Sequence, residues 1–162
     1  EKLEKFRKLM ELSENIKNFS VFSEKMRFVL RNIIYMFHRE RTACLYLLKQ
    51  DMPVKVVADK EDDFFACEKD PEALALKQFD EWVAENRQSI IIADINKEVR
   101  FVSDKTETVR SLISVPVMIN DGVAGILKIT SEEPGVFSRE DLRFLDIVSG
   151  IIGKVLAEEA YV

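Results

Sequence analysis

The most constraining feature of this sequence is a pair of apolar, strand-length runs that flank Asn120-Asp121-Gly122. Leu112–Ile119 precedes the tripeptide and Val123–Thr130 follows it. A polar connection this short that contains glycine is typical of a β-hairpin turn, and we expect Gly122 to supply the positive φ angle. Pro116 has no N–H group, which predicts a sheet edge or a bulge at that point of the first strand. The last third of the chain is therefore expected to contain two paired antiparallel strands.

An amphipathic helix is expected after the hairpin. Pro134-Gly135 predicts a turn, and Ser138 with Asp141 three residues later predicts a helix start of the capping-box type. The apolar residues that follow recur with helical spacing and form a continuous stripe: Leu142, Leu145, Val148, Ile152, Val155 and Leu156. We therefore expect one face of this helix to be buried.

Two more helices are expected near the N-terminal end. Residues 1–18 lack Pro and Gly, and their apolar residues predict a short coiled-coil-like seam: Leu9, Leu12, Ile16 and Phe19. Either Ser20 or Ser23 is expected to cap the second helix. Its apolar residues follow the i, i+3, i+4, i+7 pattern without interruption: Met26, Val29, Leu30, Ile33, Ile34 and Phe37.

The middle of the chain predicts short strands and one helix. Thr42–Lys49 and Val54–Ala58 indicate an antiparallel hairpin. Asp70-Pro71-Glu72 is typical of a helix start, and this helix is expected to end near Asn86 with Leu76, Phe79 and Val83 on one face. Ser89–Ala93 is rich in β-branched residues and predicts a strand, whereas Asp94–Val109 predicts a loop. The expected fold class is α+β: a central antiparallel sheet of five or six strands with the N- and C-terminal helices packed on one face.

The charge of the chain excludes several classes of partner. It has 24 basic and 29 acidic side chains, a formal charge of −5. Nucleic acids and anionic membranes attract clustered Lys and Arg, so we expect neither as a partner. No apolar run approaches the roughly 18 residues that a transmembrane helix needs. The sequence begins at Glu1 without a methionine, and we interpret it as part of a longer protein.

The few cysteines and the single histidine make metal and nucleophilic chemistry improbable. The chain has two cysteines, Cys44 and Cys67, and one histidine, His38. A structural zinc site needs four Cys or His ligands at short spacings, and a catalytic triad would have to use His38 as its base. Because His38 follows a predicted helix, we interpret it as a helix-terminal or surface residue. The cysteines are expected to be buried thiols rather than a disulfide, and we predict no catalytic or metal-ligating residues.

Several motifs of the last third form a family pattern. Ser111–Val117 carries a Val-Pro pair, Asp121–Leu127 carries a Gly turn, and the connection to the last helix holds Ser131, Pro134, Phe137-Ser138 and Asp141-Leu142. Ile92-Ala93-Asp94 and Arg100-Phe101 fit the same pattern upstream. Over roughly residues 20–157 the sequence resembles a GAF domain. The resemblance implies a GAF/PAS-like fold: a twisted antiparallel sheet, with the terminal helices on one face and a ligand pocket on the other.

The resemblance also implies a regulatory role. GAF domains are mostly sensor modules that dimerise through terminal helices and are linked to effector domains. We therefore expect residues 1–19 to be a helical extension or signalling helix and residues 20–162 to be the GAF domain. The expected partners are a second copy of the chain, bound through the terminal helices, and a covalently linked effector domain that lies outside this sequence. The competing interpretation buries the apolar stripes of these helices against this chain's own sheet.

Several ligand types known for GAF domains do not fit this sequence. Cyclic-nucleotide domains of the phosphodiesterase type have Asn-Lys after the second hairpin strand, where this chain has Thr130-Ser131. Bilin-binding relatives attach the chromophore to a Cys that is commonly followed by His, which neither cysteine is. Haem-binding relatives need a proximal His, and His38 is badly placed for one. Arg143-Phe144-Leu145-Asp146 matches an RxxD pattern of some cyclic-di-GMP sites, which we interpret as a chance match.

The expected ligand wall runs from Asp59 to Arg110. Aromatic side chains there can supply apolar and stacking surface, and two arginines can pair with a carboxylate or phosphate. The predicted ligand-binding residues are Phe64, Phe65, Trp82, Arg100, Phe101 and Arg110. The competing interpretation makes the aromatic residues ordinary core and the arginines solvated or internally paired. No cofactor is assigned.

These observations predict a function without enzymatic activity. The favoured hypothesis is a cytoplasmic GAF sensor domain that binds a small molecule and relays the binding through its terminal helices. The alternative is a ligand-free GAF fold that serves as a dimerisation or scaffold module. A third hypothesis is redox catalysis by Cys67. Free-methionine-sulfoxide reductases of this fold depend on a cluster of reactive cysteines in the pocket region, and in this sequence only Cys67 is expected near that region.

Overall fold

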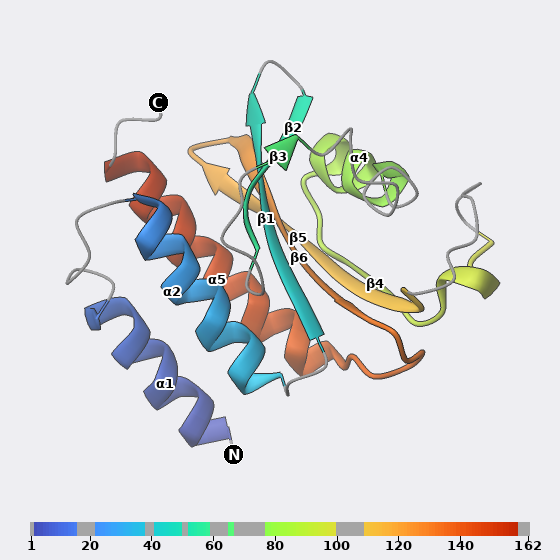
Figure 1. Cartoon of the computed structure of the whole chain (residues 1–162), viewed down its shortest axis with the longest axis horizontal. Helices are drawn as coiled ribbons and strands as arrows, with labels where there is room; N and C mark the ends of the chain where they lie inside the picture. Colours follow the sequence, from blue (N-terminus) through green and yellow to red (C-terminus); the bar gives the residue numbers. More distant parts are fainter. Residues whose placement is uncertain are drawn as a thin grey trace.

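The computed structural model describes residues 2–15, 22–37, 41–49, 52–58, 65–66, 77–99 and 109–158. It places one sheet between helices on both faces (Figure 1). The helices are α1 (Lys2–Asn15), α2 (Phe22–Met36), α4 (Lys77–Asn86) and α5 (Arg139–Glu158), with a 3-10 turn, η3, at Ile95–Lys97. The strands are β1 (Arg41–Lys49), β2 (Met52–Ala58), β3 (Phe65–Ala66), β4 (Ile90–Ile92), β5 (Ser111–Ile119) and β6 (Gly122–Ser131).

The sheet has six strands in the order β3-β2-β1-β6-β5-β4. Every neighbouring pair is antiparallel. The late hairpin β5–β6 therefore lies between the early hairpin β1–β2 and the short strand β4, with Leu127 of β6 opposite Leu45 of β1. This arrangement confirms the predicted α+β fold and antiparallel sheet. The two-residue strand β3 was not anticipated from the sequence.

The turn between β5 and β6 differs from the prediction in one detail. The hairpin itself is confirmed, but the positive φ angle, 56°, belongs to Asn120. Gly122 instead begins β6 and pairs with Ile119. Asparagine tolerates the left-handed region better than most side chains do, so Asn120 replaces the glycine that we expected in that role.

Pro116 lies where the sheet tolerates a missing donor. It pairs with Ile126 of β6 on one side. On the other side, β4 reaches only as far as Ser114, so this part of β5 lies beyond the pairing with β4. A register irregularity follows immediately, between Val117 and Met118. The prediction of an edge or a bulge is confirmed as an edge, because the side of β5 toward β4 is unpaired at Pro116.

The helices α2 and α5 lie against one face of the sheet, and α1 packs against α2 on the side away from the sheet (Figure 1). The main core joins the apolar stripes of α2 and α5 to the strands, with α2 against β1 and β2, and α5 against β5. The predicted stripe of α2 is buried at Met26, Val29, Leu30, Ile33 and Phe37. The prediction that both terminal helices lie on one face is therefore confirmed.

Two local features position α5. At its start, the Ser138 N–H donates to the Asp141 carboxylate at 2.8 Å and the Asp141 N–H donates to the Ser138 hydroxyl at 3.2 Å. This reciprocal pair is the predicted capping box. Further along, a Cβ added at Gly153 would lie 2.5 Å from the backbone oxygen of Met118. Glycine at this position lets α5 approach β5 closely.

The helix α1 presents two apolar faces with different surroundings. Leu9 and Leu12, which we expected to form a seam with a second chain, are buried in this chain's own core. That part of the seam prediction was wrong, because these leucines cover the terminal-helix core; Ile16 and Phe19 lie outside the described residues. The exposed face instead carries Leu3, Phe6 and Met10, which are 85%, 55% and 67% exposed.

The helix α4 covers the opposite face of the sheet from the terminal helices (Figure 1). Its described part begins at Lys77 and ends at Asn86, and the end agrees with the prediction. The predicted start at Asp70 and the residue Leu76 lie outside the described residues. Within the segment predicted as a loop, the 3-10 turn at Ile95–Lys97 begins at Asp94, whose side chain accepts a hydrogen bond from the Asn96 N–H. Among the described residues, no helix is long and apolar enough to cross a membrane.

Candidate ligand-binding site

Alternation along β5 and β6 divides the sheet into two faces. Leu127 and Ile129 of β6 belong to the core beneath the terminal helices. Ile126 belongs to a second buried cluster, beneath α4. Because successive strand residues point to opposite faces, Lys128 shares the α4 face with Ile126. The members of this second cluster are Phe79, Val83, Ile90, Ile92, Ile95, Val109, Leu112 and Ile126.

A charged group lies buried between α4 and the sheet. The Lys128 ammonium donates to one Asp80 carboxylate oxygen at 2.8 Å. The other carboxylate oxygen accepts a hydrogen bond of 3.4 Å from the Ser114 hydroxyl. The Lys128 and Asp80 side chains are only 1% and 3% exposed. We call these three residues the Asp80–Lys128–Ser114 cluster.

The cluster is held by the register of the sheet. Ser114 of β5 is directly opposite Lys128 of β6, and Lys128 is opposite Cys44 of β1. Ile90 of β4 is opposite Ser114 on the other side. The cluster therefore lies on a single row that crosses four strands, and α4 supplies Asp80 from above this row.

The two charges of the cluster depend on one another. Burial raises the pKa of the Asp80 carboxyl above its ordinary value of 3.8, and the Lys128 ammonium beside it opposes that rise. Removing one partner of a buried ion pair typically costs about 3–5 kcal/mol, because the other charge stays buried without compensation. Well-packed apolar residues in place of both partners are often as stable as the pair. Stability alone therefore gives no physical reason for charges at this place.

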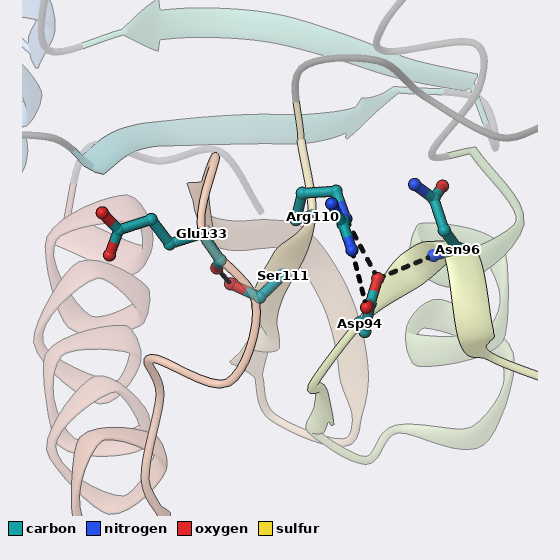
Figure 2. A network of polar contacts seen from close by, with 5 residues as sticks. All are labelled: Asp94, Asn96, Arg110, Ser111 and Glu133. Atoms are coloured by element: carbon teal, nitrogen blue, oxygen red, sulfur yellow. Dashed lines mark hydrogen bonds and ion pairs between the residues drawn. The ribbon is translucent and has the colours of Figure 1, made fainter.

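A second ion pair joins the segments before and after residues 100–108. Arg110 donates to both oxygens of the Asp94 carboxylate, through Nε at 3.2 Å and Nη2 at 2.8 Å (Figure 2). Asp94 also accepts from the Asn96 N–H at 3.1 Å. Arg110 holds the pKa of Asp94 below its ordinary value of 3.8, with a smaller contribution from the Asn96 N–H. The guanidinium fork makes this contact bidentate and therefore directional.

Backbone hydrogen bonds add to this junction. The Ile95 N–H donates to the Arg110 carbonyl at 2.7 Å, and the Arg110 N–H donates to the Ser131 carbonyl at 2.8 Å. Ser111 donates its hydroxyl to the Glu133 carbonyl at 2.5 Å (Figure 2). The start of β5 is thus tied both to η3 and to the end of β6.

The structure places three of the six predicted ligand-binding residues. Trp82 is partly buried against the cluster beneath α4. Arg110 is engaged with Asp94, which agrees with the competing interpretation of an internal ion pair. Phe65 begins β3, at the sheet edge opposite β4. Phe64, Arg100 and Phe101 lie outside the described residues, as do His38 and Cys67.

The sequence analysis missed Asp80, Ser114 and Lys128. Their signal was polarity at positions where the pattern is apolar: Lys128 alternates with Leu127 and Ile129 in a central strand. Asp80 lies three residues before Val83 and follows Phe79 directly, so helical spacing puts it at the edge of the apolar stripe of α4. Among the described residues, no group of His, Cys, Asp and Glu side chains is arranged to hold a metal ion.

Comparison with known proteins identifies the family. The sequence profile of the GAF domain matches residues 22–157. No curated protein sequence gives a match. Solved structures agree in fold, among them the GAF domain of an Acinetobacter phosphoenolpyruvate-protein phosphotransferase, with 16% identity, TM-score 0.75, and 97% of this chain and 95% of that chain covered.

Two other structural neighbours have different roles. The type II free methionine-R-sulfoxide reductase from Thermoplasma acidophilum is 17% identical with TM-score 0.65, covering 91% of this chain and 96% of that one. A far-red absorbing protein with bound biliverdin is 13% identical with TM-score 0.68, covering 95% and 99%. At these identities the likeness concerns the fold alone. The profile match over most of the chain, together with the antiparallel sheet between its two helical layers, means that the chain belongs to the GAF domain family.

Proposed function

We propose that this chain is a cytoplasmic sensor domain without enzymatic activity, which binds a small molecule beneath α4 and relays the binding through its terminal helices. The observation that carries the proposal is the division of the sheet into two buried clusters. Alternate residues of the same strand reach both clusters: Lys128 lies beneath α4, and Leu127 lies beneath the terminal helices. A movement of β6 that a ligand causes on the α4 face would therefore also change the packing against the terminal helices.

The family supports binding on the α4 face. Sensing and signalling are the general role of GAF domains, and one neighbour of the same fold holds biliverdin. The ligand of this chain would lie between α4 and the face of the sheet that carries Ile126 and Lys128. Such a ligand acts only if it binds two conformations of the domain unequally.

The relay would run through a dimer formed by α1. Leu3, Phe6 and Met10 repeat at intervals of three and four residues and are exposed. This spacing is that of a coiled-coil seam. We therefore propose that a second copy of the chain covers this stripe, and that the dimer passes the movement of the sheet to a linked effector domain.

Native mass spectrometry of the purified chain at several concentrations tests both parts. The expected result is a dimer that retains a small molecule, or takes one up from a metabolite mixture. Met10→Lys should shift the dimer toward monomer at least tenfold in dissociation constant. Glu11→Lys, which introduces the same side chain at the next exposed position, should leave the dimer unchanged.

Two results would contradict the proposal. A dimer that takes up no small molecule from any mixture would favour the scaffold alternative, in which the fold serves only for dimerisation. If wild type and Met10→Lys are both monomeric at every concentration, the proposed relay through an α1 dimer is wrong.

A further inference from the structure

The contacts of Asp80 have the form of a bound carboxylate ligand. Each of its two oxygens accepts a hydrogen bond from a different donor, one from the Lys128 ammonium at 2.8 Å and one from the Ser114 hydroxyl at 3.4 Å. Both donors belong to the sheet, whereas Asp80 belongs to α4. The sheet therefore supplies a cationic and a hydroxyl donor to a single carboxylate that comes from another element.

The surroundings of this carboxylate are apolar. Phe79 and Val83 of α4 and Ile126 of β6 belong to the same buried cluster. A charged receptor enclosed by apolar side chains selects ligands with an acidic head and an apolar body, because the head satisfies Lys128 and the body replaces buried surface.

We propose that Lys128 and Ser114 form a receptor for a small carboxylic acid with an apolar body, and that Asp80 occupies this receptor when the ligand is absent. The ligand takes the place of the Asp80 carboxylate, and α4 is released from the sheet. This inference rests on the proposed sensor function and names its ligand class. Asp80 then acts as a built-in competitor that keeps α4 docked.

The competition sets the affinity of the site. An acid tethered to α4 is present at high effective concentration next to Lys128. A free carboxylate must therefore gain affinity from its apolar body in order to displace it. If Asp80 is removed, the same ligand no longer competes with the Asp80 carboxylate for Lys128 and Ser114.

The chain contains its own reporter for this event. Trp82 is its one tryptophan, lies two residues after Asp80 on α4, and is partly buried against the apolar cluster. Release of α4 changes the solvent exposure of this indole. Trp82 emission therefore follows the docking of α4 without a label.

The decisive experiment is chemical rescue of Asp80→Ala. This variant lacks only the carboxylate group, and formate matches that group in size and charge. Formate is therefore expected to raise the melting temperature of Asp80→Ala to a plateau, because a ligand that binds the folded state stabilises it. Formamide and sodium chloride at the same concentrations should not raise the melting temperature of Asp80→Ala. Formate should not change the melting temperature of Asp80→Ala/Lys128→Met. Any of three results would overturn the carboxylate receptor. The melting temperature of Asp80→Ala could rise equally with formate and formamide, or equally with formate and phosphate. Formate could also raise the melting temperature of Asp80→Ala/Lys128→Met. If Asp80→Ala does not fold alone, the fraction of folded protein is measured at increasing formate, formamide and chloride concentrations, with the same expected difference.

A second titration tests displacement in the intact chain. Hexanoate should bind Asp80→Ala at least tenfold more tightly than wild type, measured by Trp82 emission, and hexanamide should bind neither. Equal hexanoate affinity of the two proteins would overturn the role of Asp80 as competitor.

The two proposals fail in different ways. A metabolite that binds wild type and Lys128→Met equally well would retain the sensor function and overturn the carboxylate receptor. Specific rescue by formate, in a chain that takes up no metabolite from any mixture, would retain the receptor and overturn the sensor function.

Discussion

Gly153 of α5 faces the backbone oxygen of Met118, and a Cβ atom at residue 153 would approach that oxygen to 2.5 Å. Carbon and oxygen atoms do not approach this closely without a shift of the backbone. The contact lies between the last helix and the strand that also lines the α4 face. It therefore fixes how near α5 can lie to the sheet.

Gly153→Ala should consequently destabilise the domain. Forcing an extra methyl group into a packed contact typically costs about 1–3 kcal/mol, partly offset by the better helix propensity of alanine, about 1 kcal/mol. Gly150→Ala is the matched control, because nothing lies within 4 Å of its added Cβ, and it should be neutral or stabilising by up to about 1 kcal/mol. Urea unfolding of both variants measures the difference; equal stability would mean that α5 shifts without cost.

The Asp80–Lys128 pair should behave as a unit. Lys128→Met or Asp80→Leu alone should lower the free energy of unfolding by about 3–5 kcal/mol, because each leaves a buried charge without its partner. The double variant Asp80→Leu/Lys128→Met should recover most of that loss. A double-mutant cycle from urea denaturation gives the coupling, and losses that simply add would show that the two residues are energetically independent.

The Asp94–Arg110 pair predicts a dependence of stability on pH. Because Arg110 lowers the pKa of Asp94 in the folded state, the ionised carboxylate favours folding. This contribution is fully present above the ordinary pKa of 3.8 and is lost as the pH falls through the lower, folded-state pKa. Wild type should therefore be more stable than Asp94→Asn at pH 6, and this difference should shrink as the pH falls below about 4. Thermal unfolding of both proteins from pH 6 to pH 2.5 tests this, and a difference that does not change with pH would contradict it.

The hairpin turn predicts which residues can replace Asn120. Its φ angle of 56° costs most side chains roughly 1–2 kcal/mol. Asn120→Gly should be neutral or slightly stabilising, whereas Asn120→Val should lose about 1–2 kcal/mol, because β-branched residues avoid this region. Thermal unfolding compares the two variants with wild type; a stable Asn120→Val would imply that the turn changes its conformation.

The sequence predicted best those elements whose signal is local. The β5–β6 hairpin, the capping box of Ser138 and Asp141, and the buried stripe of α2 each depend on residues close together in the chain. The error at Asn120 arises within the same short stretch, since Asn120 and Gly122 both suit a positive φ angle and only the strand register decides between them.

The cluster beneath α4 could not be predicted in this way. Asp80 and Lys128 are 48 residues apart, and their contact depends on where α4 docks. The predicted seam of α1 included leucines that this chain buries itself, for a related reason. Leu9 and Leu12 compete with Leu3, Phe6 and Met10, and only the position of α2 and α5 decides which face this chain buries.

Beyond its register irregularity, strand β6 places two sets of constraints on alternate residues. Leu127 and Ile129 support the terminal helices, whereas Ile126 and Lys128 face α4. Substitutions at residues that face α4 can therefore alter that face while Leu127 and Ile129 preserve the packing of the terminal helices. A domain built on such a strand can diversify in what it recognises and still remain interchangeable between host proteins.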